Sequence, residues 1–203
     1  MHEDQNKDLP VCDFISGPVG HRLKFGGGRG QALPKAAGFT KGRTPTVIDA
    51  TAGLGRDAFL LASLGAEVTL IERSEKIYAL LDQALEEASN HSSELNVIVA
   101  RMTLLFGDAK ELLLNLSAEV ILVDPMHPPR GNAALVKKEM RQLRALVGTD
   151  PDAADLMAVA LKQATKRVVL KWPAKAPALE TLPTASHQIL GKSTRYDVFM
   201  IHS

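Results

Sequence analysis

Three short stretches of the chain combine glycines and carboxylates in a way that could bind a ligand and act on it. The first is 49–57 (DATAGLGRD), the second ends at Glu72, and the third is 124–128 (DPMHP). Gly53 and Gly55 carry no side chains, so a ligand could lie against the backbone there. Glu72 could accept hydrogen bonds from hydroxyl groups, and Asp124 could accept one from an amine. For the first stretch taken alone, a tight turn without a ligand is the alternative.

Each of these stretches follows a short apolar segment that predicts a buried strand. The segments are 46–50, 67–72 and 119–124, and their β-branched and aliphatic residues are typical of parallel sheets. From Arg56 onward the pattern predicts a helix. A strand, a glycine turn and a helix place free backbone N–H groups beside the carboxyl end of a strand, where open α/β sheets bind ligands. We therefore expect the three stretches to meet at one edge of a sheet.

The rest of the chain predicts further helices and strands in alternation. Helical spacing of apolar residues predicts a helix from Ser74 to about Ala88, and we expect others at 109–116 and 151–165. Residues 102–106 and 167–172 predict strands, whereas 94–101 fits either a helix or a strand. Segments 186–190 and 196–201 predict an antiparallel hairpin. The expected fold is therefore α/β, with a seven-stranded, mostly parallel sheet and a C-terminal antiparallel hairpin.

Composition and length favour one globular domain. The chain has 203 residues, of which 45% are hydrophobic and 23% charged, enough for a single sizeable core. We expect a flexible leader at 1–13 and one domain at 14–203. No apolar run approaches the roughly 18 residues that span a membrane, the N-terminus is unlike a secretory signal, and Cys12 is the only cysteine. These features exclude an internal disulfide and favour a cytoplasmic location.

Two basic regions could contact an anionic partner, although the net charge of +1 does not itself indicate a nucleic-acid binder. The first, 14–45, is rich in glycine and has no acidic residue. Its basic and aromatic residues could grip phosphates and stack on a base. The second is an expected helix at 135–144. A flexible connector and a solvated helix face are the respective alternatives. The candidate residues for contact with such an anionic partner, RNA in particular if the resemblance described below holds, are Arg22, Lys24, Phe25, Arg29, Lys137, Lys138 and Arg141.

Strand ends carrying Gly-x-Gly, Glu and Asp-Pro resemble those of a class I S-adenosylmethionine-dependent methyltransferase. Asp124-Pro125 resembles the (Asn/Asp)-Pro-Pro-aromatic signature of enzymes that methylate exocyclic amines. Four longer blocks, at 21–30, 49–58, 124–126 and 134–141, together resemble the bacterial family that methylates guanine N2 of one guanosine in 16S ribosomal RNA (methyltransferase J). His127 departs from that pattern, in which an aromatic Phe is expected.

The resemblance implies a Rossmann-like fold, S-adenosylmethionine as the cofactor, and 16S ribosomal RNA or the small ribosomal subunit as the partner. It implies no metal and no membrane. The expected catalytic residues are Asp124 and Pro125, as acceptors for the target amine, and His127, as a stacking surface. The expected cofactor-binding residues are Asp49, Gly53, Gly55, Arg56, Asp57, Glu72, Arg73, Gly107, Asp108 and Asp124.

Three other functions remain open at this point. The nearest is an S-adenosylmethionine-dependent methyltransferase that acts on another amine, such as adenine N6 in nucleic acid or a protein side chain. A nicotinamide oxidoreductase is disfavoured, because the turn lacks Gly-x-Gly-x-x-Gly spacing and Asp124-Pro125 would have no task. An RNA-binding module without activity would keep the basic regions but would need neither Glu72 nor Asp124.

Overall fold

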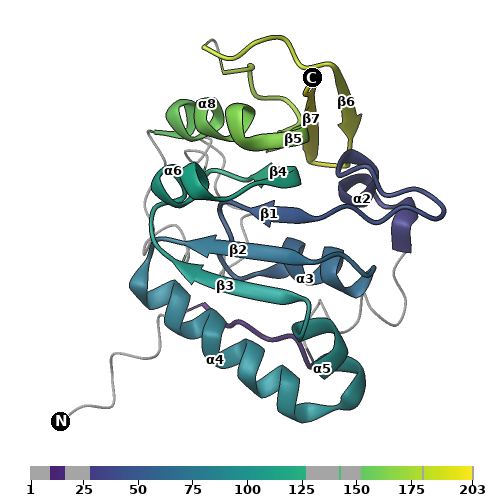
Figure 1. Cartoon of the computed structure of the whole chain (residues 1–203), viewed down its shortest axis with the longest axis vertical. Coiled ribbons are helices and arrows are strands. Elements are labelled where there is room, and N and C mark those ends of the chain that lie inside the picture. Colours follow the sequence, from purple (N-terminus) through teal and green to yellow (C-terminus); the bar gives the residue numbers. More distant parts are fainter. Residues whose placement is uncertain (1–9, 17–27, 127–141, 143–151, 180, 203) are drawn as a thin grey trace.

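The computed structural model describes residues 10–16, 28–126, 142, 152–179 and 181–202. Its centre is a seven-stranded sheet in the order β3-β2-β1-β4-β5-β7-β6 (Figure 1). Strands β1 to β5 are parallel, whereas β7 runs antiparallel to both β5 and β6. This confirms the predicted sheet and its C-terminal hairpin. The strands are β1 (Val47–Asp49), β2 (Val68–Glu72), β3 (Met102–Phe106), β4 (Ala118–Val123), β5 (Ala164–Pro173), β6 (His187–Leu190) and β7 (Thr194–Met200).

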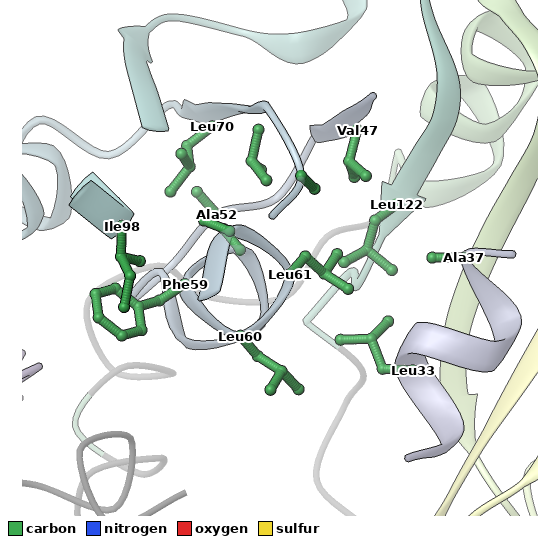
Figure 2. Packing of buried hydrophobic residues seen from close by; sticks show 14 of the residues in the cluster. Leu33, Ala37, Val47, Ala52, Phe59, Leu60, Leu61, Leu70, Ile98 and Leu122 are labelled. Carbon is green, nitrogen blue, oxygen red and sulfur yellow. The ribbon is translucent and has the colours of Figure 1, made fainter. Parts of the chain in front are cut away.

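Helices cover both faces of the sheet, and the strand residues alternate between the two resulting cores. Successive residues of β4 show the pattern, since Leu122 packs in one core and Val123 in the other. The first core lies under α2 (Ala32–Ala36), α3 (Arg56–Ser63), α4 (Glu75–His91) and α5 (Ser93–Val99). Figure 2 shows part of it around Phe59 and Leu61. The second lies under α6 (Ala109–Leu112), η2 (Leu113–Asn115) and α8 (Ala153–Gln163).

Segment 94–101, which the sequence left open between helix and strand, forms mainly helix α5. Ser92 ends α4 and begins α5, and its Oγ accepts a hydrogen bond from the Leu95 backbone N–H at 3.3 Å. This cap satisfies one N–H group of the first turn, which otherwise has no partner within the helix. Leu95 and Ile98 lie three residues apart and are both buried. The helix that we expected to end at about Ala88 thus continues to His91, and only Ser92 separates α4 from α5.

The described part of the N-terminal region packs on the domain. Phe14 is buried, and its ring stacks on Phe59 with centroids 4.5 Å apart. Cys12, within the expected leader, donates from its thiol to the Leu54 carbonyl at 3.3 Å. After η1 (Gly28–Gly30), helix α2 buries Leu33 in the first core. The basic segment 14–45 therefore contains folded structure that its glycine content did not predict.

The described residues contain neither a candidate membrane span nor a candidate metal site. None of their helices is long and apolar enough to cross a membrane. They also hold no group of three or more His, Cys, Asp or Glu side chains that could ligate a metal ion.

Candidate active site

The ends of β1, β2, β3 and β4 surround a cleft with about 600 Å³ of empty space, counted to its open mouth. All four strands are parallel, so their carboxyl ends meet at the same edge of the sheet. The structure therefore brings together stretches that are far apart in sequence, such as those of Thr51 and Asp124, which are 73 residues apart. The lining residues are Ala50, Thr51, Gly53, Ile71, Glu72, Arg73, Gly107, Asp108, Ala109, Lys110, Asp124, Met126, Asp152, Ala153 and Leu156.

Glu72 is held in the cleft by backbone hydrogen bonds to both of its carboxylate oxygens. The Gly53 N–H donates to Oε2 at 2.8 Å, and the Ser74 N–H donates to Oε1 at 2.7 Å. Burial raises the pKa of Glu72, while these N–H groups favour the charged form and oppose the shift. A carboxylate oxygen accepts about two hydrogen bonds. Glu72 is therefore oriented to accept a pair of neighbouring hydroxyl groups, as a ribose presents.

The two glycines of the turn have different roles. Both adopt positive φ, 53° at Gly53 and 68° at Gly55, which disfavours any side chain. Gly53 lines the cleft. A Cβ on Gly55 would lie 2.7 Å from Leu81 Cδ1 and 3.2 Å from Phe14 Cζ. Gly55 is thus required for packing beneath the turn, whereas our sequence interpretation gave both glycines to the cofactor.

The opposite wall of the cleft joins charged groups to a small apolar surface. Asp108 caps helix α6 by accepting from the Lys110 N–H at 2.8 Å. Lys110 Nζ and Arg73 NH1 both donate to Asp152, at 2.6 and 3.2 Å. The hydrogen bond from Lys110 lowers the pKa of Asp152. Side chains of Ile71, Ala109 and Leu156 provide apolar surface beside these groups, as a planar ring system requires.

Asp124 lies at another side of the cleft and belongs to a cluster of carboxylates around one lysine. Lys171 Nζ donates to Asp57 Oδ2 and to Asp124 Oδ2, at 2.6 Å each. The Asp124 backbone N–H donates to Thr51 Oγ1 at 2.7 Å, which fixes the start of the loop after β4. Burial disfavours the charged form of Lys171, but the Asp124 and Asp57 carboxylates outweigh it and hold the lysine pKa well above its usual value.

Asp49 ends β1 beneath this cluster and is only 2% exposed. Burial, followed by repulsion from Asp57, raises the pKa of Asp49 to about 7; Asp124 adds to the rise. The Thr51 N–H donates to Asp49 Oδ1 at 3.2 Å and opposes the shift, as does Lys171. Asp49 is thus not part of the cleft lining, but its charge interacts with those of Asp57, Asp124 and Lys171 above it.

The structure places the expected site residues in three groups. Gly53, Glu72, Arg73, Gly107, Asp108 and Asp124 line the cleft. Asp49, Gly55, Arg56, Asp57 and Pro125 are described but are not among its lining residues. His127, Arg22, Lys24, Phe25, Lys137, Lys138 and Arg141 lie outside the described residues. The sequence interpretation missed Lys110, Asp152 and Lys171, because the charged side chains to which their own side chains hydrogen-bond are at least 42 residues away.

Arg29 has a structural role that our sequence interpretation did not foresee. Its NH1 donates to the carbonyls of Thr40 and Arg43, at 2.8 and 2.7 Å. Its NH2 donates to Thr44 Oγ1 at 2.6 Å and to the Leu64 carbonyl at 3.0 Å. Leu64 ends α3, at the edge of the sheet where the strands begin (Figure 1). Arg29 is therefore bonded within the protein, at the edge of the sheet opposite the cleft.

Comparison with known proteins agrees with this geometry. A family profile described as "Putative SAM-dependent methyltransferase" matches residues 1–201. The chain is 63% identical over 199 residues to a protein of Agrobacterium fabrum named "Ribosomal RNA small subunit methyltransferase J", covering 98% of this chain and 95% of that protein. A protein of the same name from Brucella anthropi is 65% identical over 190 residues, covering 94% and 93% of the two chains. The chain belongs to the methyltransferase J family.

Solved structures place methyltransferase J within a wider fold. A SAM-dependent methyltransferase from Neisseria gonorrhoeae superposes with a TM-score of 0.74 at 35% identity, covering 95% of this chain and 75% of that one. An RNA methyltransferase from Salinibacter ruber, solved with S-adenosyl-L-homocysteine, gives a TM-score of 0.51 at 16% identity over 83% and 87% of the two chains, and shares the fold alone. S-adenosylmethionine is the cofactor of this methyltransferase family.

The lining of the cleft fits that cofactor. Glu72 presents a fixed carboxylate suited to the ribose hydroxyls, and Gly53 leaves the neighbouring backbone open. The apolar surface of Ile71, Ala109 and Leu156, beside Asp108, suits the adenine ring. When bound, the cofactor supplies an activated methyl group on sulfur, so the chain's own work is orientation and electrostatics.

Proposed function

We propose that this chain transfers a methyl group from S-adenosylmethionine to the exocyclic N2 amine of one guanosine in 16S, small-subunit ribosomal RNA. The observation that carries the proposal is Asp124, whose carboxylate lines the same cleft as Glu72 while its side chain stays 40% exposed. The names of relatives at 63% and 65% identity support the choice of small-subunit ribosomal RNA. A cytoplasmic location belongs to the same proposal.

The chemistry asks the chain to make a poor nucleophile reactive. The lone pair of a guanine N2 amine is delocalised into the ring. Asp124 accepts a hydrogen bond from this amine and the Pro125 carbonyl accepts the second, which favours a pyramidal nitrogen with its lone pair directed at the methyl carbon. Orientation of this kind supplies up to about 7–11 kcal/mol of barrier reduction in the best intramolecular cases.

The electron balance of the transfer is simple. The nitrogen lone pair forms the new N–C bond, the C–S bond breaks, and its electron pair remains on sulfur. The methylated nitrogen is then cationic and loses one proton, first to Asp124 and then to solvent. Because this cation is a strong acid, even a weakly basic carboxylate suffices to remove the proton.

The target base must leave its stack to reach such a cleft, which favours single-stranded or looped RNA. In this proposal His127 stacks on the base, and Arg22, Lys24, Phe25, Lys137, Lys138 and Arg141 contact the RNA. Arg29 is left out, since its guanidinium already donates to four oxygens within the protein. The nearest alternative is a methyltransferase for another amine, because Asp124-Pro125 would also suit adenine N6 or a protein side chain.

Methyl transfer to small-subunit RNA tests the proposal. The substrates are naked RNA and assembled subunits from a strain that lacks the enzyme, and the modified nucleoside is identified by mass spectrometry. The expected product is N2-methylguanosine at a single position, formed by the wild-type protein and not by Asp124→Ala. A methyl group found on adenine or on ribosomal protein would instead establish the alternative.

A further inference from the structure

Lys171 has no role in the cofactor and amine contacts described above, yet it lies at the centre of the site's charges. It comes from β5, whereas its two carboxylate partners come from the first turn of α3 (Asp57) and the residue after β4 (Asp124). Both hydrogen bonds from Nζ are 2.6 Å long, which is typical of strong charge-assisted pairs. One ammonium group thus links two elements that bound the site.

Burial strengthens the electrostatic interactions between Lys171 and the carboxylates around it. The side chains of Lys171 and Asp57 are 24% and 19% exposed, and Asp49 lies beneath them with almost no exposure. Like charges in such surroundings repel strongly, since little water screens them. Lys171 is the cation that the structure places among the carboxylates of Asp49, Asp57 and Asp124.

We propose that Lys171 is a positioning residue for methyl transfer: its ammonium group fixes the Asp124 carboxylate toward the target amine and keeps it ionised. The proposal rests on the proposed function in one respect, namely that Asp124 receives an amine. Lys171 acts through Asp124 and does not itself touch the reacting atoms. Its second bond, to Asp57, fixes the ammonium group from the other side, so that Asp124 is held against a rigid partner.

The cost of this arrangement to Asp124 is small. An ammonium ion in contact makes a carboxylate a weaker base, but the carboxylate is needed first as an ionised hydrogen-bond acceptor. A protonated Asp124 would present a donor on one oxygen and accept poorly from the amine. The proton that finally leaves comes from a cationic nitrogen, so a strong base is not required. The reaction therefore depends on an ionised Asp124 that accepts a hydrogen bond, and it does not depend on Asp124 being a strong base.

The neighbouring charges predict opposite effects for two substitutions. Asp124 bonds to Lys171, with Asp57 on the same lysine and Asp49 below them. Lys171→Met removes the ammonium group that bonds Asp124, so Asp124 should take up a proton at higher pH. Asp57→Asn removes a negative charge and leaves Lys171 to Asp124 alone, so Asp124 should take up its proton at lower pH. A role limited to packing predicts neither shift.

The test is single-turnover methyl transfer to small-subunit RNA between about pH 5 and pH 9, at saturating cofactor. We expect Lys171→Met to lower the rate at neutral pH roughly 100-fold. We also expect it to move the acid limb of the rate profile up by about one pH unit or more. Lys171→Arg, which keeps the charge, should leave the limb in its wild-type position and recover part of the rate. Asp57→Asn should move the limb downward.

A folded Lys171→Met protein whose acid limb coincides with that of the wild type would overturn the proposal. If that variant does not fold, Asp57→Asn decides: a downward shift supports the proposal, and an unmoved limb overturns it. Calorimetry with S-adenosylmethionine should show less than a tenfold change in cofactor affinity for Lys171→Met. A larger change that accounts for the whole loss of rate would make Lys171 a cofactor residue and also overturn the proposal.

Failure of the proposed function gives a different result from failure of this inference. If the wild-type protein methylates no small-subunit RNA, the proposed function fails, and the role of Lys171 is then measured without substrate. Denaturant unfolding of Lys171→Met should show a deficit relative to Lys171→Arg that grows from about pH 4 to pH 7, as the carboxylates ionise without their cation. A deficit that does not depend on pH would overturn the electrostatic role.

Discussion

The two edges of the sheet use their charged residues for different purposes. At the edge where the strands end, Glu72 and Asp124 line a cleft, and Lys171 links the Asp124 carboxylate to that of Asp57. At the edge where the strands begin, Arg29 donates to three backbone carbonyls and a hydroxyl. Arg167 likewise donates to the Ala36 carbonyl at 3.3 Å. One edge lines a cleft with charged groups, and the other uses charge to attach the N-terminal segment.

The difference follows from which backbone groups each edge has to satisfy. At the carboxyl edge, the turn before α3 and the starts of α4 and α6 have free N–H groups, which hydrogen-bond to the carboxylates of Glu72 and Asp108. At the other edge, helix α3 ends, and its last carbonyls attract cations such as Arg29. A charged residue in the sequence is therefore available to a ligand only where backbone groups of the protein do not already use all of its hydrogen-bonding capacity.

The largest expected effect is at Asp124. Asp124→Ala removes the acceptor for the target amine, and methyl transfer should fall by at least roughly 1000-fold. Cofactor affinity should stay within about tenfold, since the lost contact is mainly to the substrate. Radiolabelled methyl transfer and calorimetry measure the two effects. Full activity in this variant would show that Asp124 only pairs with Lys171. The two edges of the sheet would then not differ in the way proposed.

Arg29→Ala should reduce the free energy of unfolding by about 2–4 kcal/mol, because several hydrogen bonds to one charged group are lost together. The salt dependence of RNA binding should not change. Urea unfolding and RNA titrations at several salt concentrations measure these quantities.

Lys138→Ala is the counterpart of Arg29→Ala, at a position outside the described residues. This variant should flatten the salt dependence of RNA binding by about one counterion. It should leave cofactor binding unaffected. If Arg29→Ala instead flattened the salt dependence of RNA binding and left the free energy of unfolding unchanged, Arg29 would be an RNA contact after all.

Glu72→Ala should weaken cofactor binding by about 1.5–3 kcal/mol, the range for hydrogen bonds to a charged group. Isothermal calorimetry with S-adenosylmethionine measures the change. Glu72→Gln is the matched control, because it keeps the shape and one acceptor oxygen while removing the charge. Its cofactor affinity should lie between those of the wild type and Glu72→Ala. Unchanged affinity in both variants would mean that the end of β2 does not hold the ribose.

The smallest effect is expected at Arg43, on the same edge as Arg29. Its NH2 bonds Glu119 at 2.8 Å, but the two side chains are 50% and 32% exposed. Exposed ion pairs contribute at most about 1 kcal/mol, so Arg43→Ala should lower stability by less than that. A loss as large as that of Arg29→Ala would show that charge alone, rather than bonding to backbone carbonyls, holds the segment.

Much of the fold and part of the cleft could be predicted from local sequence. Short apolar segments that end in Asp49, Glu72 and Asp124 predicted parallel strands, and parallel strands must end at one edge. The sequence also predicted the terminal hairpin, since its two strands are separated by a short turn. It could not decide 94–101, because the helix there depends on burying Leu95 and Ile98 against distant elements.

The sequence by itself determined that a glycine turn and carboxylates would meet at one edge, because this follows from the pattern of strands and helices. Only the tertiary structure decided how each charge is used. Lys171 and Asp57 are 114 residues apart, and position 55 needs a glycine because Leu81 and Phe14 leave no room there for a side chain. Arg29 bonds a carbonyl 35 residues away. Such pairings depend on distances and burial that arise when separate elements pack, and no local pattern encodes them.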